Sequence, residues 1–316
     1  ADGHLGGPAG TPMRALITGG GGFVGRHLAR HLDAAGDEVT TTDRTIDGCD
    51  ILDAPALLDR FRRFRPEVVY HLAGASDVGG SWSNPQATFR ANAEGTLNVL
   101  WAAREAGCER VLTVGSADVY GKVTAEDLPI TEEQPLRPVS PYAASKCAAD
   151  HVALQAFLGH DQQVIRARPF NHLGPGQTDR FVAPALAGRV ARNELTGEEV
   201  VQVGNLSPKR DFTDVRDVVR AYRLLVERGT PGEVYNVCSG KAIAVQELAD
   251  QFIAMAKTPM RLEPDPALQR PVDIPVLLGD SSKLRRDTGW EPEIPLEQTL
   301  RDLLDDRRRQ VAAELD

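Results

Sequence analysis

The sequence is short of cysteine, of long apolar runs and of basic charge. Its four cysteines are scattered with no Cys-x-x-Cys pair, so we expect neither a disulfide framework nor a metal site, but reduced thiols in a cytoplasmic protein. No apolar run approaches the roughly 20 residues of a membrane span. Lys and Arg number 36 against 45 Asp and Glu, which argues against nucleic acid as a partner. We therefore expect a protein that acts on a small molecule.

Between residues 14 and 168, short apolar segments alternate with longer amphipathic ones. The pattern predicts strands at 14–18, 38–42, 67–72, 109–115 and 162–168, and helices at about 23–35, 54–64, 84–106 and 141–157. Several of these strands are continuously apolar, as is usual where helices cover both faces of a sheet. The sequence therefore predicts an α/β fold, with a Rossmann-type doubly wound parallel sheet and a smaller α/β C-terminal lobe.

The same pattern divides the chain. Residues 1–12 precede Met13 and are rich in Gly and Pro, so we interpret them as a cloning remnant. Residues 13–168 form the expected dinucleotide-binding domain, and 169–316 form the expected second lobe, with 208–240 partly returning to the first. Beyond 168 we expect helices at about 181–196, from 215, and at 245–256 and 295–313, with strands at 200–203 and 233–238.

A glycine-rich turn joins the first predicted strand to the first predicted helix. Gly19, Gly22 and Gly25 stand at i, i+3 and i+6. Gly19 permits a tight turn, Gly22 lets the backbone approach a pyrophosphate, and Gly25 lets the helix pack on the strand. The first turn of that helix contains Phe23 and Val24, and its N–H groups and dipole favour a phosphate. The turn therefore predicts a dinucleotide site.

An acidic residue ends the second predicted strand. Asp43 lies 18 residues beyond Gly25, where a carboxylate accepts hydrogen bonds from the adenosine ribose of NAD. The same carboxylate would repel the 2′-phosphate of NADP, whereas the adjacent Arg44 would attract it. Both cofactors stay open, with NAD(H) favoured.

Two further segments complete the expected cofactor site. Asp50 and Ile51 could face the adenine, although Asp50 could equally belong to the N-cap region of the helix that follows Asp53. We expect the strand end Leu72-Ala-Gly74 to lie beneath the cofactor, with Leu72 and Ala73 in contact with it. His71 is expected to be a packed core residue rather than a catalyst.

The segment Ser140-Pro-Tyr-Ala-Ala-Ser-Lys146 contains two candidate catalytic residues. Tyr142 and Lys146 stand at i and i+4 and so share one face of a helix. A free tyrosine titrates near pH 10, and we expect the ammonium of Lys146 to lower the pKa of Tyr142 toward neutrality. Ser116, at the end of another predicted strand, supplies a hydroxyl for a reacting carbonyl oxygen. The three residues predict carbonyl reduction or alcohol oxidation.

These motifs resemble the extended short-chain dehydrogenases/reductases of the nucleotide-sugar branch. Thr-Gly-x-x-Gly-x-x-Gly, His-Leu-Ala-Gly, Ser-Ala-Asp-Val-Tyr-Gly and Ser-Pro-Tyr-x-x-Ser-Lys occur in the family's order. The resemblance covers about residues 14–290 and implies that Ser116, Tyr142 and Lys146 form the catalytic triad. It also implies a homodimer formed through helices 84–106 and 141–157.

The second lobe resembles that of enzymes acting on guanosine diphosphate sugars. The resemblance rests on 168–177, 209–217, 269–273 and 278–280. It implies a GDP-linked sugar as the substrate, contacted by Ser76, Ser116, Asn171, Arg210 and Arg270. Amide and guanidinium donors suit a dianionic diphosphate.

Several reactions share this scaffold. A 4,6-dehydratase needs an extra acid–base group, and Asp118 stands where that subgroup has a glutamate. Gly21-Gly22-Phe23 and Val182-Ala-Pro-Ala185 depart from the mannose dehydratases. The sequence therefore most resembles the reductases of GDP-4-keto-6-deoxy-D-mannose, with the 4,6-dehydratase and a 4-epimerase as alternatives. A catalytically dead dinucleotide-binding sensor is the non-enzymatic alternative, and the intact triad argues against it.

Overall fold

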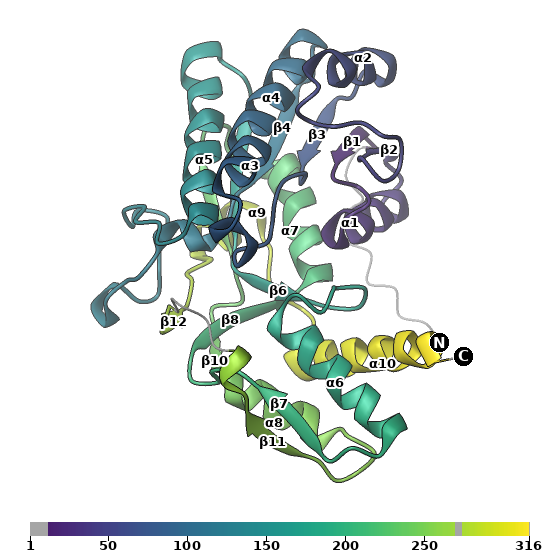
Figure 1. Cartoon of the computed structure of the whole chain (residues 1–316). Coiled ribbons are helices and arrows are strands. Elements are labelled where there is room, and N and C mark those ends of the chain that lie inside the picture. Colours follow the sequence, from purple (N-terminus) through teal and green to yellow (C-terminus); the bar gives the residue numbers. More distant parts are fainter. Residues whose placement is uncertain (1–11, 269–273, 316) are drawn as a thin grey trace, which may run out of the picture.

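A six-stranded parallel sheet forms the centre of the first lobe (Figure 1). The structure is a computed structural model that describes residues 12–268 and 274–315. The strands lie in the order β2-β1-β3-β4-β5-β9. Their bounds are β1 Arg14–Thr18, β2 Glu38–Thr42, β3 Val68–His71, β4 Arg110–Val114, β5 Val164–Pro169 and β9 Val234–Val237. Because all these pairs are parallel, the carboxyl ends of the strands share one edge of the sheet.

Helices cover both faces of this sheet. Helices α1 (Phe23–Ala34) and α7 (Val215–Arg228) pack on one face, where Leu28 and Tyr222 share a core with Ile17. Helices α2 (Ala54–Phe64), α4 (Gly95–Glu105) and α5 (Pro141–His160) pack on the other, where Val99 joins Leu16. Since neighbouring strand residues point to opposite faces, both faces must be apolar, as the unbroken apolar runs indicated. The expected doubly wound fold is confirmed.

The predicted helix 84–106 has an irregular middle. It consists of α3 (Pro85–Phe89), a π-helical turn at Arg90–Glu94 (η2), and α4. Asn92 lies in the π turn with its side chain buried. Such a turn is frequent at functional sites.

The second lobe combines short strands with three helices. Strand β8 (Lys209–Asp214) pairs with β6 (Asn171–Leu173), β10 (Ala242–Ala244) and β12 (Val276–Leu277), and β7 (Val200–Val203) pairs with β11 (Arg261–Pro264). Helices α6 (Val182–Thr196), α8 (Val245–Ala254) and α10 (Leu296–Leu315) share a separate core. Helix α9 (Ser282–Thr288) packs against α7.

The agreement with the sequence pattern is uneven between the two lobes. Strands β1 and β2 and helix α2 have the predicted bounds, and β9 pairs with β5 in the main sheet. The pattern missed β6, β8, β10, β11, β12 and α9, because most of these elements are too short to show a period, and β8 is polar.

Four short 3₁₀ turns complete the described elements: η1 (Gly80–Trp82), η3 (Ala117–Tyr120), η4 (Ala125–Asp127) and η5 (Pro266–Leu268). Within the described ranges no helix combines the length and apolarity of a membrane span.

Candidate active site

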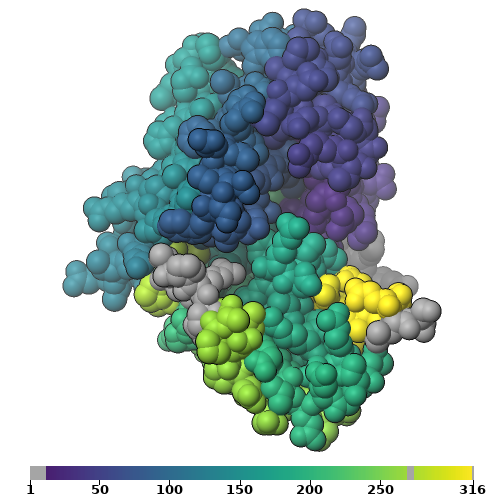
Figure 2. Space-filling view, in the orientation of Figure 1, coloured from purple at the N-terminus to yellow at the C-terminus, as the bar shows by residue number. Residues whose placement is uncertain are grey.

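A large cavity lies where the carboxyl ends of the parallel strands face the second lobe. Its volume is about 1080 Å³, and both lobes contribute to its lining. Figure 2 shows the face on which purple and blue residues of the first lobe meet green residues of the second. In doubly wound folds, ligands bind outside the carboxyl ends of the strands. The cavity is therefore the candidate active site.

The cavity gathers nearly every residue that the sequence singled out. From the first lobe it is lined by the predicted residues Gly19, Gly22, Phe23, Val24, Gly25, Asp43, Arg44, Asp50, Ile51, Leu72, Ala73, Ser76, Ser116, Asp118, Tyr142 and Lys146. Asn171 and Arg210 line it from the second lobe. Arg270 lies outside the described residues. The individual roles of these residues stay predictions.

The glycine turn after β1 leaves room for a phosphate group. Gly19 has φ of +76°, and a Cβ there would lie 2.6 Å from the backbone N of Ala73. A Cβ on Gly25 would lie 2.3 Å from the carbonyl O of Gly19. Gly22 precedes α1, and no described side chain caps the N–H groups of its first turn. Because an uncapped helix N-terminus attracts phosphate, the turn fits the pyrophosphate of a dinucleotide.

Asp43 follows β2 and is held in place by its own turn. Its Oδ1 accepts hydrogen bonds from the backbone N of Thr45 at 2.8 Å and from Thr45 Oγ1 at 2.7 Å. The side chain of Arg44 is 78% exposed, and its guanidinium lies 4.0 Å from Asp50. A fixed carboxylate and a mobile cation thus stand side by side on the cavity wall.

Asp50 and Asp53 have separate local roles. Asp53 caps α2 by accepting a hydrogen bond from the backbone N of Ala56 at 3.1 Å. Asp50 accepts one from the backbone N of Leu52 at 2.9 Å and also lines the cavity. The cap therefore belongs to Asp53, and the contact of Asp50 with a cofactor stays a prediction.

Tyr142, Lys146 and Ser116 converge on one part of the cavity. Tyr142 and Lys146 lie on α5, which begins after the N-cap residue Ser140, and both are buried. The Ser116 hydroxyl lies close enough to the Tyr142 phenol to lower the pKa of the phenol. Lys146 donates from Nζ to the carbonyl O of Val114, the last residue of β4, at 3.0 Å. The ends of β4 and α5 thus bring the three side chains together.

The predicted direction of the Tyr142 pKa is wrong for the protein alone. Burial of the phenol raises its pKa above the ordinary value, the Asp118 carboxylate raises it further, and the neighbouring Ser116 hydroxyl lowers it only in part. Lys146 is itself buried, which lowers its pKa to about 8. Desolvation therefore outweighs the expected effect of the ammonium. The phenol stays protonated and can donate a proton.

Two positioning side chains were missed from the sequence. Asn92, in the π turn, accepts a hydrogen bond from the backbone N of Ala75 at 2.8 Å and donates to Ser145 Oγ at 2.8 Å. Ser81 Oγ accepts one from the backbone N of Tyr142 at 3.2 Å. They tie the segment after β3 to the start of α5. No spacing signal marks them, since their partners are distant in sequence.

The second lobe closes the cavity with residues that the sequence did not single out. Arg180, Phe181, Arg189 and Leu206 line it together with Asn171 and Arg210. The Arg210 guanidinium donates to the carbonyl O of Ile274 at 2.7 Å. This wall therefore carries guanidinium and amide donors that suit an anionic ligand.

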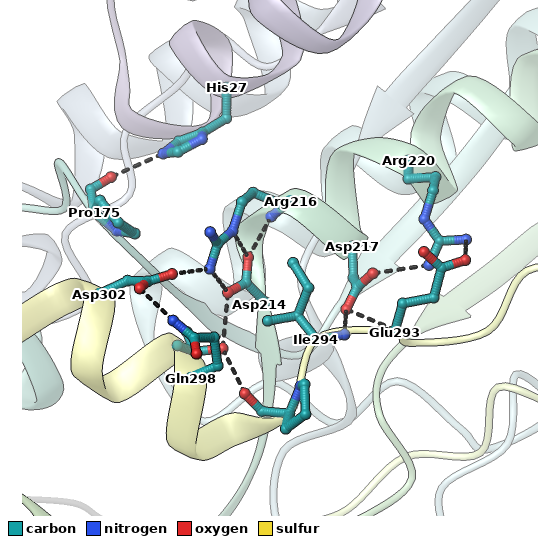
Figure 3. Close-up of polar contacts among 12 residues, drawn as sticks. His27, Pro175, Asp214, Arg216, Asp217, Arg220, Glu293, Ile294, Gln298 and Asp302 are labelled. Atoms are coloured by element: carbon teal, nitrogen blue, oxygen red, sulfur yellow. Dashed lines mark hydrogen bonds and ion pairs between the residues drawn. The ribbon is translucent and has the colours of Figure 1, made fainter. Parts of the chain in front are cut away.

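Polar contacts join the two lobes beside the cavity (Figure 3). His27 of α1 makes a hydrogen bond from Nε2 to the carbonyl O of Pro175 at 2.8 Å. The Arg216 guanidinium bridges Asp214 and Asp302 of α10, at 2.7 Å from each. The His27 bond holds the loop after β6 against α1, whose N-terminus follows the glycine turn, and the Arg216 bonds hold α10 against the start of α7.

Comparisons with known proteins agree with this arrangement. A profile described as the NAD dependent epimerase/dehydratase family matches residues 15–238. The GDP-6-deoxy-D-mannose reductase of Pseudomonas aeruginosa is 38% identical over 304 residues, which are 96% of this chain and 99% of that protein.

Two solved structures have the same fold. A structure of RMD from Pseudomonas aeruginosa complexed with NADPH superposes with a TM-score of 0.87 at 37% identity, covering 94% of this chain and 99% of that one. The Thermus thermophilus UDP-glucose 4-epimerase in complex with NAD reaches 0.84 at 28% identity, with 94% and 99% covered.

No group of three or more His, Cys, Asp or Glu within residues 12–268 and 274–315 is arranged to hold a metal ion.

The matched profile, residues 15–238, includes the glycine turn and most of the residues that line the cavity. The chain therefore belongs to the NAD dependent epimerase/dehydratase family and is an NAD(P)-dependent oxidoreductase.

Proposed function

We propose that the protein reduces the C4 ketone of GDP-4-keto-6-deoxy-D-mannose to give GDP-D-rhamnose. The observation that carries the proposal is the buried, protonated phenol of Tyr142, which lies beside Ser116 in a cavity lined by both lobes. Reduction of a ketone needs a proton donor at the carbonyl oxygen, and this phenol is one. The resemblance to a GDP-6-deoxy-D-mannose reductase over nearly the whole chain supports the substrate.

The residues of the chain would supply everything except the hydride. When bound in the cavity, NAD(P)H would supply the hydride for the carbonyl carbon. Ser116 donates a hydrogen bond to the carbonyl oxygen as negative charge develops there, and it is fixed in advance by accepting a bond from the backbone N of Asp118 at 3.2 Å. Tyr142 transfers its proton to that oxygen, which completes the alcohol. Lys146, held at Val114, would bind the nicotinamide ribose and help to reprotonate the phenolate.

The second lobe would bind the nucleoside diphosphate. Arg210 and Asn171 line the cavity there and would contact the diphosphate and ribose. Ser76, after β3, would face the sugar. Arg270 is proposed, with Arg210 and Asn171, to contact the diphosphate and ribose. Guanidinium–phosphate hydrogen bonds are charge-assisted and therefore strong.

We further propose that NAD(H) is preferred over NADP(H). The Asp43 carboxylate is fixed by Thr45 on the cavity wall and would repel a 2′-phosphate. Arg44 partly offsets this repulsion, because its exposed guanidinium can swing toward the phosphate. The preference is therefore expected to be small.

One observation favours a second reaction, the 4,6-dehydration of GDP-mannose. Asp118 lines the cavity close enough to Tyr142 to raise the pKa of the phenol. A carboxylate in this position could abstract the C5 proton that a dehydratase removes. It is shorter than the glutamate expected there, so we place this reaction second.

Two parallel incubations separate the reactions. With GDP-4-keto-6-deoxy-D-mannose and NADH or NADPH, the reductase should oxidise the cofactor and yield GDP-D-rhamnose, identified by NMR. With GDP-mannose alone, a dehydratase would form the 4-keto-6-deoxy product, 18 Da lighter through loss of one water, a mass fixed by the reaction itself. The reductase assignment would be contradicted if the cofactor were not oxidised in the first incubation, or if GDP-mannose lost water in the second.

We also propose a homodimer formed through α4 and α5. Leu97 and Trp101 of α4 are 51% and 36% exposed, and Leu158 at the end of α5 is 70% exposed. An exposed apolar patch of this kind is typical of a protein interface. Light scattering should give twice the monomer mass, and Leu97→Glu should shift the protein toward monomer. A monomeric wild type would contradict the proposal.

A further inference from the structure

A buried charged network lies behind the candidate catalytic residues. Asp150 of α5, one turn beyond Lys146, is 5% exposed. Its carboxylate accepts hydrogen bonds from Arg166 Nη1 at 2.8 Å, and from Nη2 and Nε of Arg168 at 2.9 and 3.2 Å. Arg168 of β5 is also 5% exposed. The network therefore links the helix of Tyr142 and Lys146 to the strand that leads to Asn171.

The same arginine reaches the turn that carries Ser116 and Asp118. Arg168 Nη1 donates to the hydroxyl of Tyr120, in η3, at 3.0 Å, and its guanidinium lies 5.2 Å from the centre of that ring. The Tyr120 hydroxyl donates in turn to Oδ1 of Asn236 in β9 at 2.7 Å. The stem of Arg168 runs beneath Gly115, where a Cβ would lie 3.6 Å from Arg168 Cγ. Arg168 thus lies next to Gly115 on one side of Ser116 and contacts Tyr120 on the other.

We propose that Arg168 and Tyr120 are positioning residues, which hold Ser116 and Asp118 in register with Tyr142 and Lys146. The inference rests on the proposed function, since it concerns the same reacting carbonyl. The two halves of the site come from segments 26 residues apart, counting from Ser116 to Tyr142, and meet only through tertiary contacts. Lys146–Val114 is one such contact, Cys147 Sγ to the carbonyl O of Val119 is a second, and the Asp150–Arg168–Tyr120 chain is a third.

The planar fork of arginine explains why this residue type is needed. One guanidinium gives two parallel donors to Asp150 and a third, at a fixed angle, to Tyr120. The orientation of α5 is thereby transmitted to η3 through a rigid group. A misplacement of the Ser116 hydroxyl by about 1 Å would cost up to about 100-fold in rate.

The decisive variant is Tyr120→Phe, which removes only one hydroxyl. We expect kcat to fall by about 10-fold to 100-fold, with KM for the sugar nucleotide and the cofactor within about twofold of wild type. In a Ser116→Ala background the same change should cost less than about threefold, because residues that act through one another are not additive. Arg168→Lys, which keeps a cation beside Asp150 but loses the fork, should reproduce the kcat loss.

Tyr235→Phe is the matched control. The Tyr235 hydroxyl also accepts one hydrogen bond, from Thr230 N at 3.0 Å, and donates one, to Asp287 at 3.0 Å, but neither the residue nor its partners belong to η3 or to the Asp150–Arg168 network. Tyr235→Phe should lower thermal stability by about as much as Tyr120→Phe does, and it should leave kcat unchanged. An equal kcat loss in both tyrosine variants, or none in Tyr120→Phe, would overturn the inference.

A second measurement needs no substrate. Amide hydrogen exchange in residues 116–121 should become at least about tenfold faster in Tyr120→Phe than in wild type, and stay unchanged in Tyr235→Phe. Unchanged exchange in Tyr120→Phe would overturn the inference even if the protein proves to catalyse another reaction. An inactive wild type with the expected change in exchange would instead contradict the proposed function alone.

Discussion

His71 should make the folded protein less stable in acid, because its hydrogen bonds favour the neutral imidazole, which carries a single proton. Its ring is buried between Thr18 Oγ1, 2.8 Å from Nδ1, and Thr96 Oγ1, 3.0 Å from Nε2. Thr96 uses its own hydrogen to donate to the carbonyl O of Asn92 at 2.6 Å. His71 must therefore donate from Nε2 and accept from Thr18 at Nδ1. A second proton, on Nδ1, would reverse the Thr18 bond, because the hydroxyl would have to rotate and accept from the ring instead of donating to it.

The size of the effect follows from the pKa. Burial, with a smaller contribution from the charge of Lys146, lowers the pKa of His71 from 6.5 to about 3. Above pH 6.5 the imidazole is neutral in both folded and unfolded protein. Below it the unfolded state binds a proton that the folded state refuses, so the stabilisation is lost as the pH falls toward 3. Between pH 7.5 and 4.5 the loss amounts to roughly 3 kcal/mol, since each pKa unit corresponds to about 1.4 kcal/mol.

Urea unfolding at pH 7.5 and 4.5, followed by tryptophan fluorescence, measures this loss. His71→Asn should be less stable than wild type at pH 7.5, yet on acidification its free energy of unfolding should fall by roughly 3 kcal/mol less than that of wild type. Carboxylates titrate in both proteins, so their contribution cancels in the difference. His160→Asn, at an exposed position at the end of α5, controls for the loss of a histidine as such. Equal pH dependence in wild type and His71→Asn would refute the reasoning.

Three substitutions test the proposed roles in the cavity. Tyr142→Phe should abolish turnover and spare cofactor affinity, measured by fluorescence titration, because the ring stays and only the proton donor is lost; a variant with most of its activity would remove the proposed acid. Arg210→Ala should raise KM for the sugar nucleotide by about 10-fold to 100-fold through the loss of charge-assisted bonds, and an unchanged KM would displace Arg210 from the substrate site. Asp43→Ala should narrow the ratio of kcat/KM between NADH and NADPH, so an identical ratio before and after would contradict the ribose contact.

Local sequence patterns were sufficient for the first lobe. The alternation of apolar strands and amphipathic helices predicts the doubly wound sheet, because each element must bury its own apolar face. The glycines at i, i+3 and i+6 predict the turn after β1, since few other residues fit its conformation and close contacts. Tyr142 and Lys146 share a helix face through their spacing alone.

The second lobe was less predictable because its strands are short and polar. Strand β8 contains Asp211, which is buried only because Ser239 and Gly240 donate hydrogen bonds to it from another strand end. Such partners are distant in sequence and leave no period. The wall that includes Arg180 and Arg189 was missed for the same reason.

By itself the sequence determined the nucleotide-binding architecture and the chemical types at the site, because both depend on neighbours within a few residues. Only the tertiary structure decided how those groups behave. Burial and the Asp118 carboxylate raise the pKa of Tyr142, although an adjacent ammonium predicted the reverse. The link from Asp150 through Arg168 to Tyr120 likewise exists only once α5, β5 and η3 are packed together. Desolvation and long-range hydrogen bonds are properties of the folded interior, and linear spacing does not encode their balance.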